Sequence, residues 1–137
     1  MKLPILSALT LVLTGFASHA AATTAREYQA TLVAEARAGD AAFQGFSAAR
    51  GDTFFHQRHN GDWSCATCHT DNPAASGLHA VTHKTIRPLA PAANAERFTS
   101  PEKIEKWFKR NCNDVLKRAC TAREKGDLID FLLTVKP

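Results

Sequence analysis

Cys65-Ala66-Thr67-Cys68-His69 is the stretch of sequence that decides the fold of this chain. It is a C-x-x-C-H motif, which is the attachment signature of c-type haem. Cys65 and Cys68 lie one helical turn apart, so each thiol can form a thioether bond with one vinyl group of the haem. His69 follows directly and lies where it can bind the iron as the proximal ligand. The motif therefore predicts one covalently bound haem c.

Two other interpretations of these cysteines are possible. Cys65 and Cys68 with His79 and His83 give C-x2-C-x10-H-x3-H, which superficially resembles a zinc finger. The spacer contains proline and glycine and lacks the apolar positions that a finger core needs. A dithiol redox site of the thioredoxin kind would be expected in an α/β context, and no such pattern is present. Haem attachment is the interpretation that the sequence favours.

The N-terminus has the pattern of a secretory signal peptide. Lys2 gives a positive start, residues 3–16 are largely apolar, and small residues around Ala20 and Ala22 suit cleavage. The apolar run is shorter than the roughly 20 residues that a membrane span needs. We therefore expect a signal peptide at residues 1–20, with cleavage as late as residue 22. Residues 21–137 form one exported, periplasmic monohaem domain without stable membrane insertion.

The charge of the chain does not indicate a nucleic-acid partner. The formal net charge is +4 at pH 7 and includes Lys2, and two haem propionates would bring the mature protein close to neutral. Basic residues do lie close together in the C-terminal part. They either keep the protein soluble, which the sequence favours, or form a weak docking patch for an acidic redox partner: Lys103, Lys106, Lys109, Arg110, Lys117 and Arg118.

The apolar residues of the mature chain recur with helical spacing, and no run alternates like a half-buried strand. A first apolar stripe ends at Gly39, and Ser47 is expected to cap a second helix that continues to about His56. Residues 71–97 are rich in helix breakers, which predicts a long loop that covers a haem edge. The stripe and the breakers are Ala25, Tyr28, Leu32, Ala36, Pro73, Gly77, Pro88 and Pro91.

Two further helices are predicted in the C-terminal part. Thr99 or Ser100 caps the first, with Pro101 in its first turn and Glu102 able to complete a capping box with Thr99. The second opens with the capping box Thr121-Ala122-Arg123-Glu124. The fold class is therefore all-α. The apolar faces contain Ile104, Trp107, Phe108, Val115, Leu128, Ile129, Phe131, Leu132 and Val135.

The remaining cysteines, Cys112 and Cys120, are predicted to pair. An exported protein does not usually keep loose thiols, and the haem accounts for the other two of the four cysteines. The bond would close a short loop and stabilise the fold by roughly 2–3 kcal/mol on the chain-entropy account.

The sixth iron ligand is not methionine. Met1 is the only methionine, and the signal peptide would remove it. The candidates are His56, His59, His79, His83, a lysine and Asn111. Asn111 lies on the apolar face of its helix, where an unsatisfied amide would cost about 1–3 kcal/mol, and iron would satisfy it. An asparagine that satisfies the helix end is an equally good interpretation of the pattern alone.

Several segments resemble one family of class I cytochromes c, the sphaeroides haem protein family with the related cytochrome c double-prime. The resemblance runs from about residue 47 to the C-terminus. The segments are Ile86-Arg87-Pro88-Leu89-Ala90-Pro91, Arg97-Phe98-Thr99, Glu105-Lys106-Trp107, Arg110-Asn111-Cys112-Asn113, Cys120-Thr121 and Glu124-Lys125.

The resemblance implies a class I cytochrome c fold with an extra N-terminal helix and one disulfide, Cys112–Cys120. It also implies that the residue before Cys112 is the sixth ligand, which makes this chain, with Asn111, similar to the asparagine type rather than the histidine type. Pro88 matches the proline whose carbonyl orients the proximal histidine in such cytochromes, so it is expected to accept a hydrogen bond from His69 Nδ1.

The expected function is one-electron transfer with a redox partner protein, for which another c-type cytochrome is a candidate. Asn111 is expected to dissociate on reduction and to admit oxygen or nitric oxide. Two alternatives stay open: a bis-histidine electron shuttle, with His83 as one candidate ligand, and a haem enzyme of the oxygen reductase or peroxidase kind. An enzyme is the less favoured alternative, because no residue clearly supplies a distal acid-base histidine.

Overall fold

The structure is a computed structural model that describes the backbone of residues 16–137 and the side chains from residue 24 onward. Residues 1–15, which hold nearly all of the apolar run of the predicted signal peptide, lie outside the described residues. The predicted cleavage positions fall in the first turns of the first helix. The boundary between signal peptide and mature domain therefore stays a prediction.

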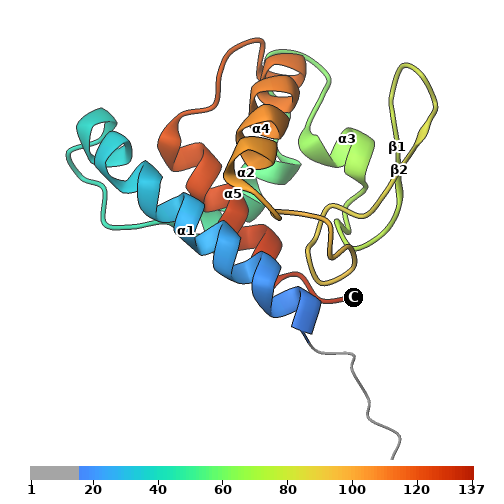
Figure 1. Ribbon diagram of the computed structural model, residues 1–137. Coiled ribbons are helices and arrows are strands. Elements are labelled where there is room, and N and C mark those ends of the chain that lie inside the picture. The colour runs from blue at the N-terminus through green and yellow to red at the C-terminus, as the bar shows by residue number, and fades with distance from the viewer. Residues whose placement is uncertain (1–15) are drawn as a thin grey trace, which may run out of the picture.

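Five helices and one small hairpin make up the described chain (Figure 1). α3 and the hairpin lie on one side of α4, while α1 and α5 lie on the other. The predominance of helix confirms the predicted all-α class. The elements are α1 (Phe16–Gly39), α2 (Ala48–His56), α3 (Cys65–His69), β1 (Gly77–Leu78), β2 (Thr85–Ile86), α4 (Pro101–Leu116) and α5 (Ala122–Thr134).

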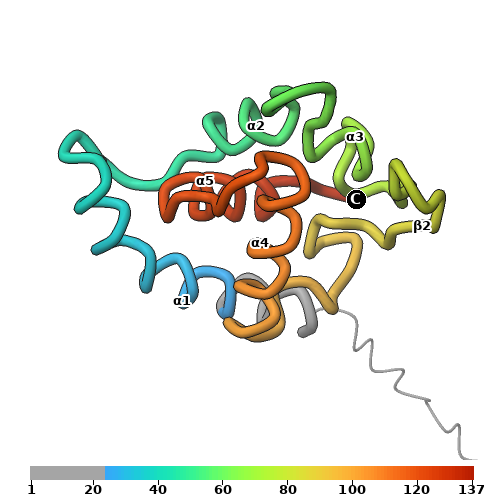
Figure 2. The backbone as a smooth tube through the Cα atoms, turned by 90° about the horizontal axis from the view of Figure 1, so that it is seen from above, coloured from blue at the N-terminus to red at the C-terminus, as the bar shows by residue number. Residues whose placement is uncertain are grey.

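The core forms around α5, which runs between α1 and α2 (Figure 2). The predicted stripe of α1 is buried, and its members Ala25 and Ala36 are 0% and 3% exposed. Phe55 of α2, Phe108 of α4 and Ile129 of α5 complete the same cluster, and each is at most 1% exposed. Burial of side chains of this size is the main favourable term in the folding free energy.

The close approach of α2 to α5 depends on Gly51. A Cβ atom at this position would lie 2.0 Å from the backbone oxygen of Asp127, so no larger residue fits without a shift. The Asp127 carboxylate reinforces the contact, since it accepts hydrogen bonds of 2.7 Å from the Ser47 amide and from Arg50 Nε and Nη2. Because α3 follows α2 after a short turn, this contact fixes the place where the C-x-x-C-H motif begins.

Helix starts follow the predicted capping residues with one exception. Ser47 caps α2, and Thr121 and Glu124 form the predicted capping box of α5. The prediction of a capping box between Thr99 and Glu102 was wrong. Ser100 is the N-cap of α4, and its hydroxyl accepts from the Lys103 amide at 3.2 Å. Pro101 then occupies the first helical position, where its missing N–H costs nothing.

The loop at residues 71–97 is more ordered than the sequence predicts. Its strands β1 and β2 pair in antiparallel fashion, with Gly77 opposite Ile86 and Leu78 opposite Thr85. Each strand has only two residues, so neither could show the alternation by which strands are recognised in sequence. The hairpin lies directly against α3. Their contact is so close that a Cβ atom at Gly77 would be 2.0 Å from the Cys68 carbonyl oxygen.

One polar cluster ties three helices together. Glu105 of α4 accepts hydrogen bonds from Tyr28 of α1 and from Lys125 of α5, the latter at 2.8 and 2.9 Å. Burial alone would raise the pKa of Glu105, but the hydrogen bonds from Lys125 and Tyr28 outweigh it and hold this pKa below its ordinary value. The cluster therefore stabilises the fold more strongly when Glu105 is ionised.

Replacing Gly51 with alanine is expected to destabilise the domain by about 1–3 kcal/mol, because the added methyl group overpacks the contact of α2 with α5. Urea unfolding followed by circular dichroism measures the change. Gly39→Ala is the matched control, since a Cβ atom there has no neighbour within 4 Å. Equal stability of the two variants would contradict the role given to Gly51.

The stability difference between wild type and Glu105→Gln is expected to depend on pH. A carboxylate whose pKa is depressed on folding stabilises the protein above its unfolded pKa, about 4.3, and this contribution is lost as the pH falls through the folded value. The difference should be largest at neutral pH and should shrink below about pH 4. Urea unfolding of both proteins at several pH values tests this, and a constant difference would contradict it.

Candidate haem site

The predicted haem-attachment residues all lie on α3, a single short helix with a capping box. Ser64 Oγ accepts from the Thr67 amide at 3.2 Å, and Thr67 Oγ1 accepts from the Ser64 amide at 2.9 Å. These two bonds start a helix that is only five residues long. The helix ends at Thr70, whose φ of 62° does not continue it. Cys65, Cys68 and His69 are therefore held in one turn with fixed relative positions.

A cavity of about 650 Å³ lies between α3 and α4. Cys65, Cys68 and His69 line it from α3, while Trp107, Asn111 and others line it from α4. Such a size suits an organic cofactor. Much of the remaining surface is apolar and suits the faces of a macrocycle: Phe54, Trp63, Ile86, Phe108, Val115, Leu116 and Leu128.

The walls of the cavity are connected to each other. Asn60 lies in the turn just before α3, and its Nδ2 donates a hydrogen bond to the carbonyl oxygen of Leu116, the last residue of α4. The Trp63 ring in the same turn lies 5.8 Å from the Lys117 ammonium. These contacts set the separation between the helix of the haem motif and the helix of Asn111.

The His69 side chain is suited to bind a metal. It is buried, and burial, with a smaller effect of the Arg97 charge, lowers its pKa to about 4. The imidazole is therefore neutral at pH 7, which is the form that ligates a metal ion. The position agrees with the predicted role of proximal ligand.

The two cysteines of the motif are free thiols at the cavity wall. Burial raises the pKa of Cys65 to about 12. A thiol of this kind stays protonated at neutral pH, whereas thiol redox sites and metal sites use a thiolate. The Cys68 sulfur accepts a 3.4 Å hydrogen bond from the Ala80 amide. The Cys65 thiol is thus poorly suited to dithiol redox chemistry or to a thiolate metal site.

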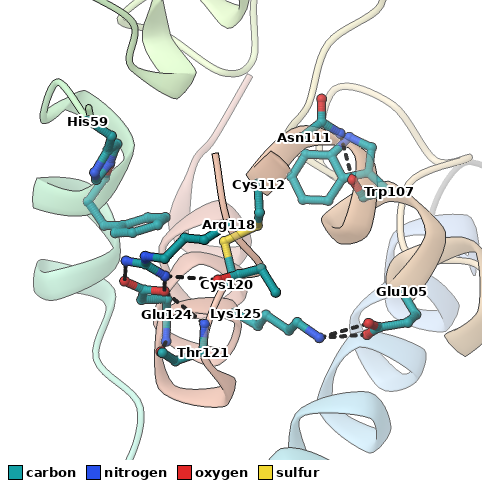
Figure 3. The surroundings of a disulfide bond; sticks show 12 residues. His59, Glu105, Trp107, Asn111, Cys112, Arg118, Cys120, Thr121, Glu124 and Lys125 are labelled. Carbon is teal, nitrogen blue, oxygen red and sulfur yellow. Dashed lines mark hydrogen bonds and ion pairs between the residues drawn. A yellow bond between two sulfur atoms is a disulfide. The ribbon is translucent and has the colours of Figure 1, made fainter. Parts of the chain in front are cut away.

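Asn111 lines the same cavity as His69, from α4, and its amide has a defined orientation. Nδ2 donates a 2.8 Å hydrogen bond to the Trp107 carbonyl oxygen one turn earlier in α4 (Figure 3). A carbonyl can only accept, so the amide nitrogen must face it and the amide oxygen points elsewhere. The Asn111 oxygen is therefore the atom that remains for a metal ion.

The histidines predicted as alternative sixth ligands differ in whether they line the cavity. Of these, His79 lines it, from the hairpin that packs against α3. Its Nδ1 accepts from the Val81 and Thr82 amides at 3.3 and 3.1 Å. His56, His59 and His83 are not among the residues that line the cavity, and the ring nitrogens of His56 and His59 lie against backbone carbonyls.

The predicted disulfide is confirmed. Cys112 and Cys120 are bonded, with 5.5 Å between their Cα atoms, and join the end of α4 to the start of α5 (Figure 3). Arg118 and Glu124 bridge the same loop through two hydrogen bonds of 2.8 and 2.7 Å. The residue that follows Asn111 is thus anchored to the neighbouring helix.

The carbonyl of Pro88 accepts two hydrogen bonds of 2.9 Å, from Asn94 Nδ2 and from Arg97 Nε. Its bond to His69 stays a prediction. Sequence reasoning did not single out Arg97 as a site residue, although it lines the cavity and its charge contributes to the low pKa of His69. Only the resemblance segment Arg97-Phe98-Thr99 offered a signal, because an arginine in a loop is not informative by itself.

The fold and the cavity define the chain as a c-type cytochrome. The cavity has two free thiols, a neutral buried imidazole, apolar walls and the half-buried cation of Arg97. This set of groups fits a covalently attached haem c. No helix in the part of the chain that the structure describes is both long enough and apolar enough to span a bilayer.

Residues 41–132 match the family described as "Domain of unknown function (DUF1924)", and the chain belongs to that family. Cytochrome c'' of Methylophilus methylotrophus is 36% identical over 140 residues, which cover 98% of this chain and 96% of the relative. Cytochrome c-type protein SHP of Cereibacter sphaeroides is 48% identical over 69 residues, which cover 50% of this chain and 53% of the relative.

Solved structures give the same result. Oxidised cytochrome c'' from Methylophilus methylotrophus superposes with a TM-score of 0.78 at 35% identity over 85% of this chain and 98% of that chain. Oxidised SHP, described as an oxygen-binding cytochrome c, superposes with a TM-score of 0.65 at 38% identity. The match covers 82% of this chain and 94% of that chain. Both findings confirm the resemblance and the fold that the sequence predicts.

Replacing both Cys65 and Cys68 with serine is expected to abolish covalent haem attachment, because no thioether can then form. The measurement is haem-dependent peroxidase staining after denaturing electrophoresis of protein made in a host that matures c-type cytochromes. Wild type should stain and the double variant should not. Haem that resists denaturation in the double variant would contradict the assignment.

Proposed function

We propose that the chain is an exported, periplasmic monohaem c-type cytochrome that exchanges one electron with a partner protein. Asn111 binds the ferric iron opposite His69 and dissociates on reduction, which leaves that position free for oxygen or nitric oxide. The observation that carries the proposal is the place of Asn111. Its side chain lines the cavity together with His69, and its amide nitrogen, rather than its oxygen, is bonded to the Trp107 carbonyl. The oxygen-binding relative supports it.

The chemistry of the amide supports a redox-dependent bond. An amide oxygen is a hard and neutral ligand, which suits the ferric ion better than the softer ferrous ion. A methionine sulfur, by contrast, favours the reduced state and raises the potential. Asn111 is therefore suited to hold the oxidised iron and to leave the reduced one.

The surroundings of Asn111 support a short and reversible movement. Its amide nitrogen keeps the Trp107 carbonyl as a partner within the same helix, and the Cys112–Cys120 bond holds the next residue to α5. The side chain can then rotate away from the iron while the backbone stays in place. Cytochrome c'', for which a solution structure addresses haem-ligand detachment, superposes with a TM-score of 0.74.

Export to the periplasm is supported by the N-terminal pattern and by the disulfide. The bond between Cys112 and Cys120 suits an oxidising compartment, where such bonds form and persist.

The bis-histidine alternative has one observation in its favour, because His79 also lines the cavity. Its hairpin packs against α3, the helix that already supplies His69, whereas α4 forms the facing wall. We therefore prefer Asn111, which lines the cavity from α4, as the ligand for the opposite side of the iron.

Replacing Asn111 with alanine is expected to remove the sixth ligand from the ferric protein. Its absorption and electron paramagnetic resonance spectra should shift toward high-spin, five-coordinate iron, because an alanine has no ligating atom. Binding of a small ligand to the ferric protein, measured by stopped flow with cyanide, should become faster, since no protein group has to leave first.

The matched control is Asn113→Ala, which changes an exposed asparagine of the same helix and should leave both spectra and binding rates as in wild type. His79→Ala tests the bis-histidine alternative. An unchanged ferric spin state in Asn111→Ala, together with a changed one in His79→Ala, would overturn the assignment of Asn111.

A further inference from the structure

Tyr28 is the only tyrosine of the chain, and it lies in the core where α1 contacts α4. It is 6% exposed. Its ring lies nearly parallel to that of Phe108, with 6.4 Å between the ring centroids and 13° between the ring planes. Phe108 in turn lines the cavity. A single aromatic ring therefore separates the phenol of Tyr28 from the candidate haem site.

A proton acceptor lies next to this phenol. The Tyr28 hydroxyl donates to Glu105 Oε2, and Lys125 Nζ donates to both oxygens of the same carboxylate, at 2.8 and 2.9 Å (Figure 3). Burial alone would raise the pKa of Glu105, but the hydrogen bonds from Lys125 and Tyr28 outweigh it and keep the carboxylate ionised at neutral pH. The Glu105 side chain is 51% exposed, so a proton that it accepts can exchange with water.

This arrangement decides how Tyr28 can be oxidised. Burial, with the hydrogen bond to Glu105, raises the pKa of Tyr28, so the phenol is protonated at neutral pH. A phenol that has lost an electron is a strong acid, and its oxidation is favoured where a base takes the proton at the same time. A carboxylate within hydrogen-bond reach of the hydroxyl is such a base.

The two tryptophans of the chain, Trp63 and Trp107, line the cavity but lack such a base. In the part of the chain that the structure describes, neither indole N–H is hydrogen-bonded to a carboxylate. The Lys117 ammonium lies 5.8 Å from the Trp63 ring, where its charge disfavours a radical cation. Trp107 meets Phe108 edge to face at 4.9 Å, so an electron can pass from Tyr28 to an oxidised Trp107 across the same ring.

We propose that Tyr28 is a redox-active residue that donates one electron to the haem site when hydrogen peroxide oxidises it, with Glu105 as the proton acceptor. The proposal rests on the haem and on the open iron position of the proposed function, because a position that admits oxygen also admits peroxide. Tyr28 then holds the oxidising equivalent at a distance from the cofactor and from the two tryptophans.

The electrons and protons of the step balance. When the O–O bond of peroxide breaks, two electrons are taken up, one oxygen leaves as water with both peroxide protons, and the other stays at the haem. One electron comes from Tyr28 and one from the haem. The O–H bond of the phenol breaks as the electron leaves, and its proton passes to Glu105 Oε2 along the existing hydrogen bond. A neutral phenoxyl radical remains, and one electron from the redox partner with return of the proton restores Tyr28.

Freeze-quench electron paramagnetic resonance of the ferric haem-loaded protein, mixed with hydrogen peroxide, tests the proposal. Wild type should give a tyrosyl radical signal. Ring-deuterated tyrosine in the growth medium should narrow this signal, because the hyperfine splitting from the ring protons is then lost. Since the chain has one tyrosine, such narrowing assigns the radical to Tyr28. Tyr28→Phe keeps the ring that lies on Phe108 and should lose the signal.

Glu105→Gln tests the proton acceptor. Glutamine keeps an oxygen that can accept the hydrogen bond but does not take the proton, so the yield of the tyrosyl radical should fall several-fold. The matched control is Glu102→Gln, which changes an exposed carboxylate in the first turn of the same helix and should leave the yield as in wild type. Circular dichroism and the ferric absorption spectrum, at the temperature of mixing, check that all variants are folded.

Protection of the cofactor is measured separately. With the same excess of hydrogen peroxide, the haem absorption of Tyr28→Phe should bleach faster than that of wild type. Mass spectrometry should find more oxidation of Trp63 and Trp107 in the variant, since the oxidising equivalent then stays in the cavity.

Three results would overturn the proposal. One is a wild-type radical whose spectrum does not respond to deuterated tyrosine, or no protein radical at all. Another is a wild-type yield of tyrosyl radical in folded Glu105→Gln. The third is an equal rate of haem bleaching in wild type and Tyr28→Phe.

Failure of this proposal can be told apart from failure of the proposed function. The haem stain and the Asn111→Ala spectra report the cofactor and the sixth ligand without any peroxide. In the Asn111→Ala background peroxide reaches the ferric iron directly, so the lack of a tyrosyl radical there would contradict the role of Tyr28 whichever side chain binds the iron.

Discussion

The contact between α2 and α5 at Gly51 is the constraint on which the rest of the structure depends. Because Gly51 has no side chain, the Asp127 backbone can lie against it, and the Asp127 carboxylate then bonds Ser47 and Arg50. The end of α2 determines where α3 begins, and α5 is joined to α4 by Cys112–Cys120. This close packing contact, together with the Asn60–Leu116 hydrogen bond between the walls, thus places the two walls of the cavity relative to each other.

The two walls make different chemical contributions. The α3 wall is rigid, because its capping box and its packing against the hairpin hold Cys65, Cys68 and His69 in one turn. The α4 wall has its backbone anchored by Cys112–Cys120, so the movement that we propose for Asn111 would be confined to its side chain. This division suits a cofactor that must remain attached on one side and become accessible on the other.

Sequence reasoning succeeded where a local rule was sufficient. Caps such as Ser47 and Thr121 depend on neighbouring residues only, and the disulfide followed from the number of cysteines. It failed where competing local rules applied, as at Thr99 and Ser100, and where strands were too short to show a pattern. It also gave no role to Arg97, since the burial of a loop arginine depends on what folds around it.

By itself, the sequence determined the helical class, and it predicted the attachment chemistry and a sixth ligand other than methionine, because each of these depends on residue type and spacing along the chain. Only the tertiary structure decided that Asn111 shares the cavity with His69, and that Arg97 of the loop lines the same cavity. His69 and Asn111 are about forty residues apart in the sequence, and such a juxtaposition arises from packing rather than from local preference.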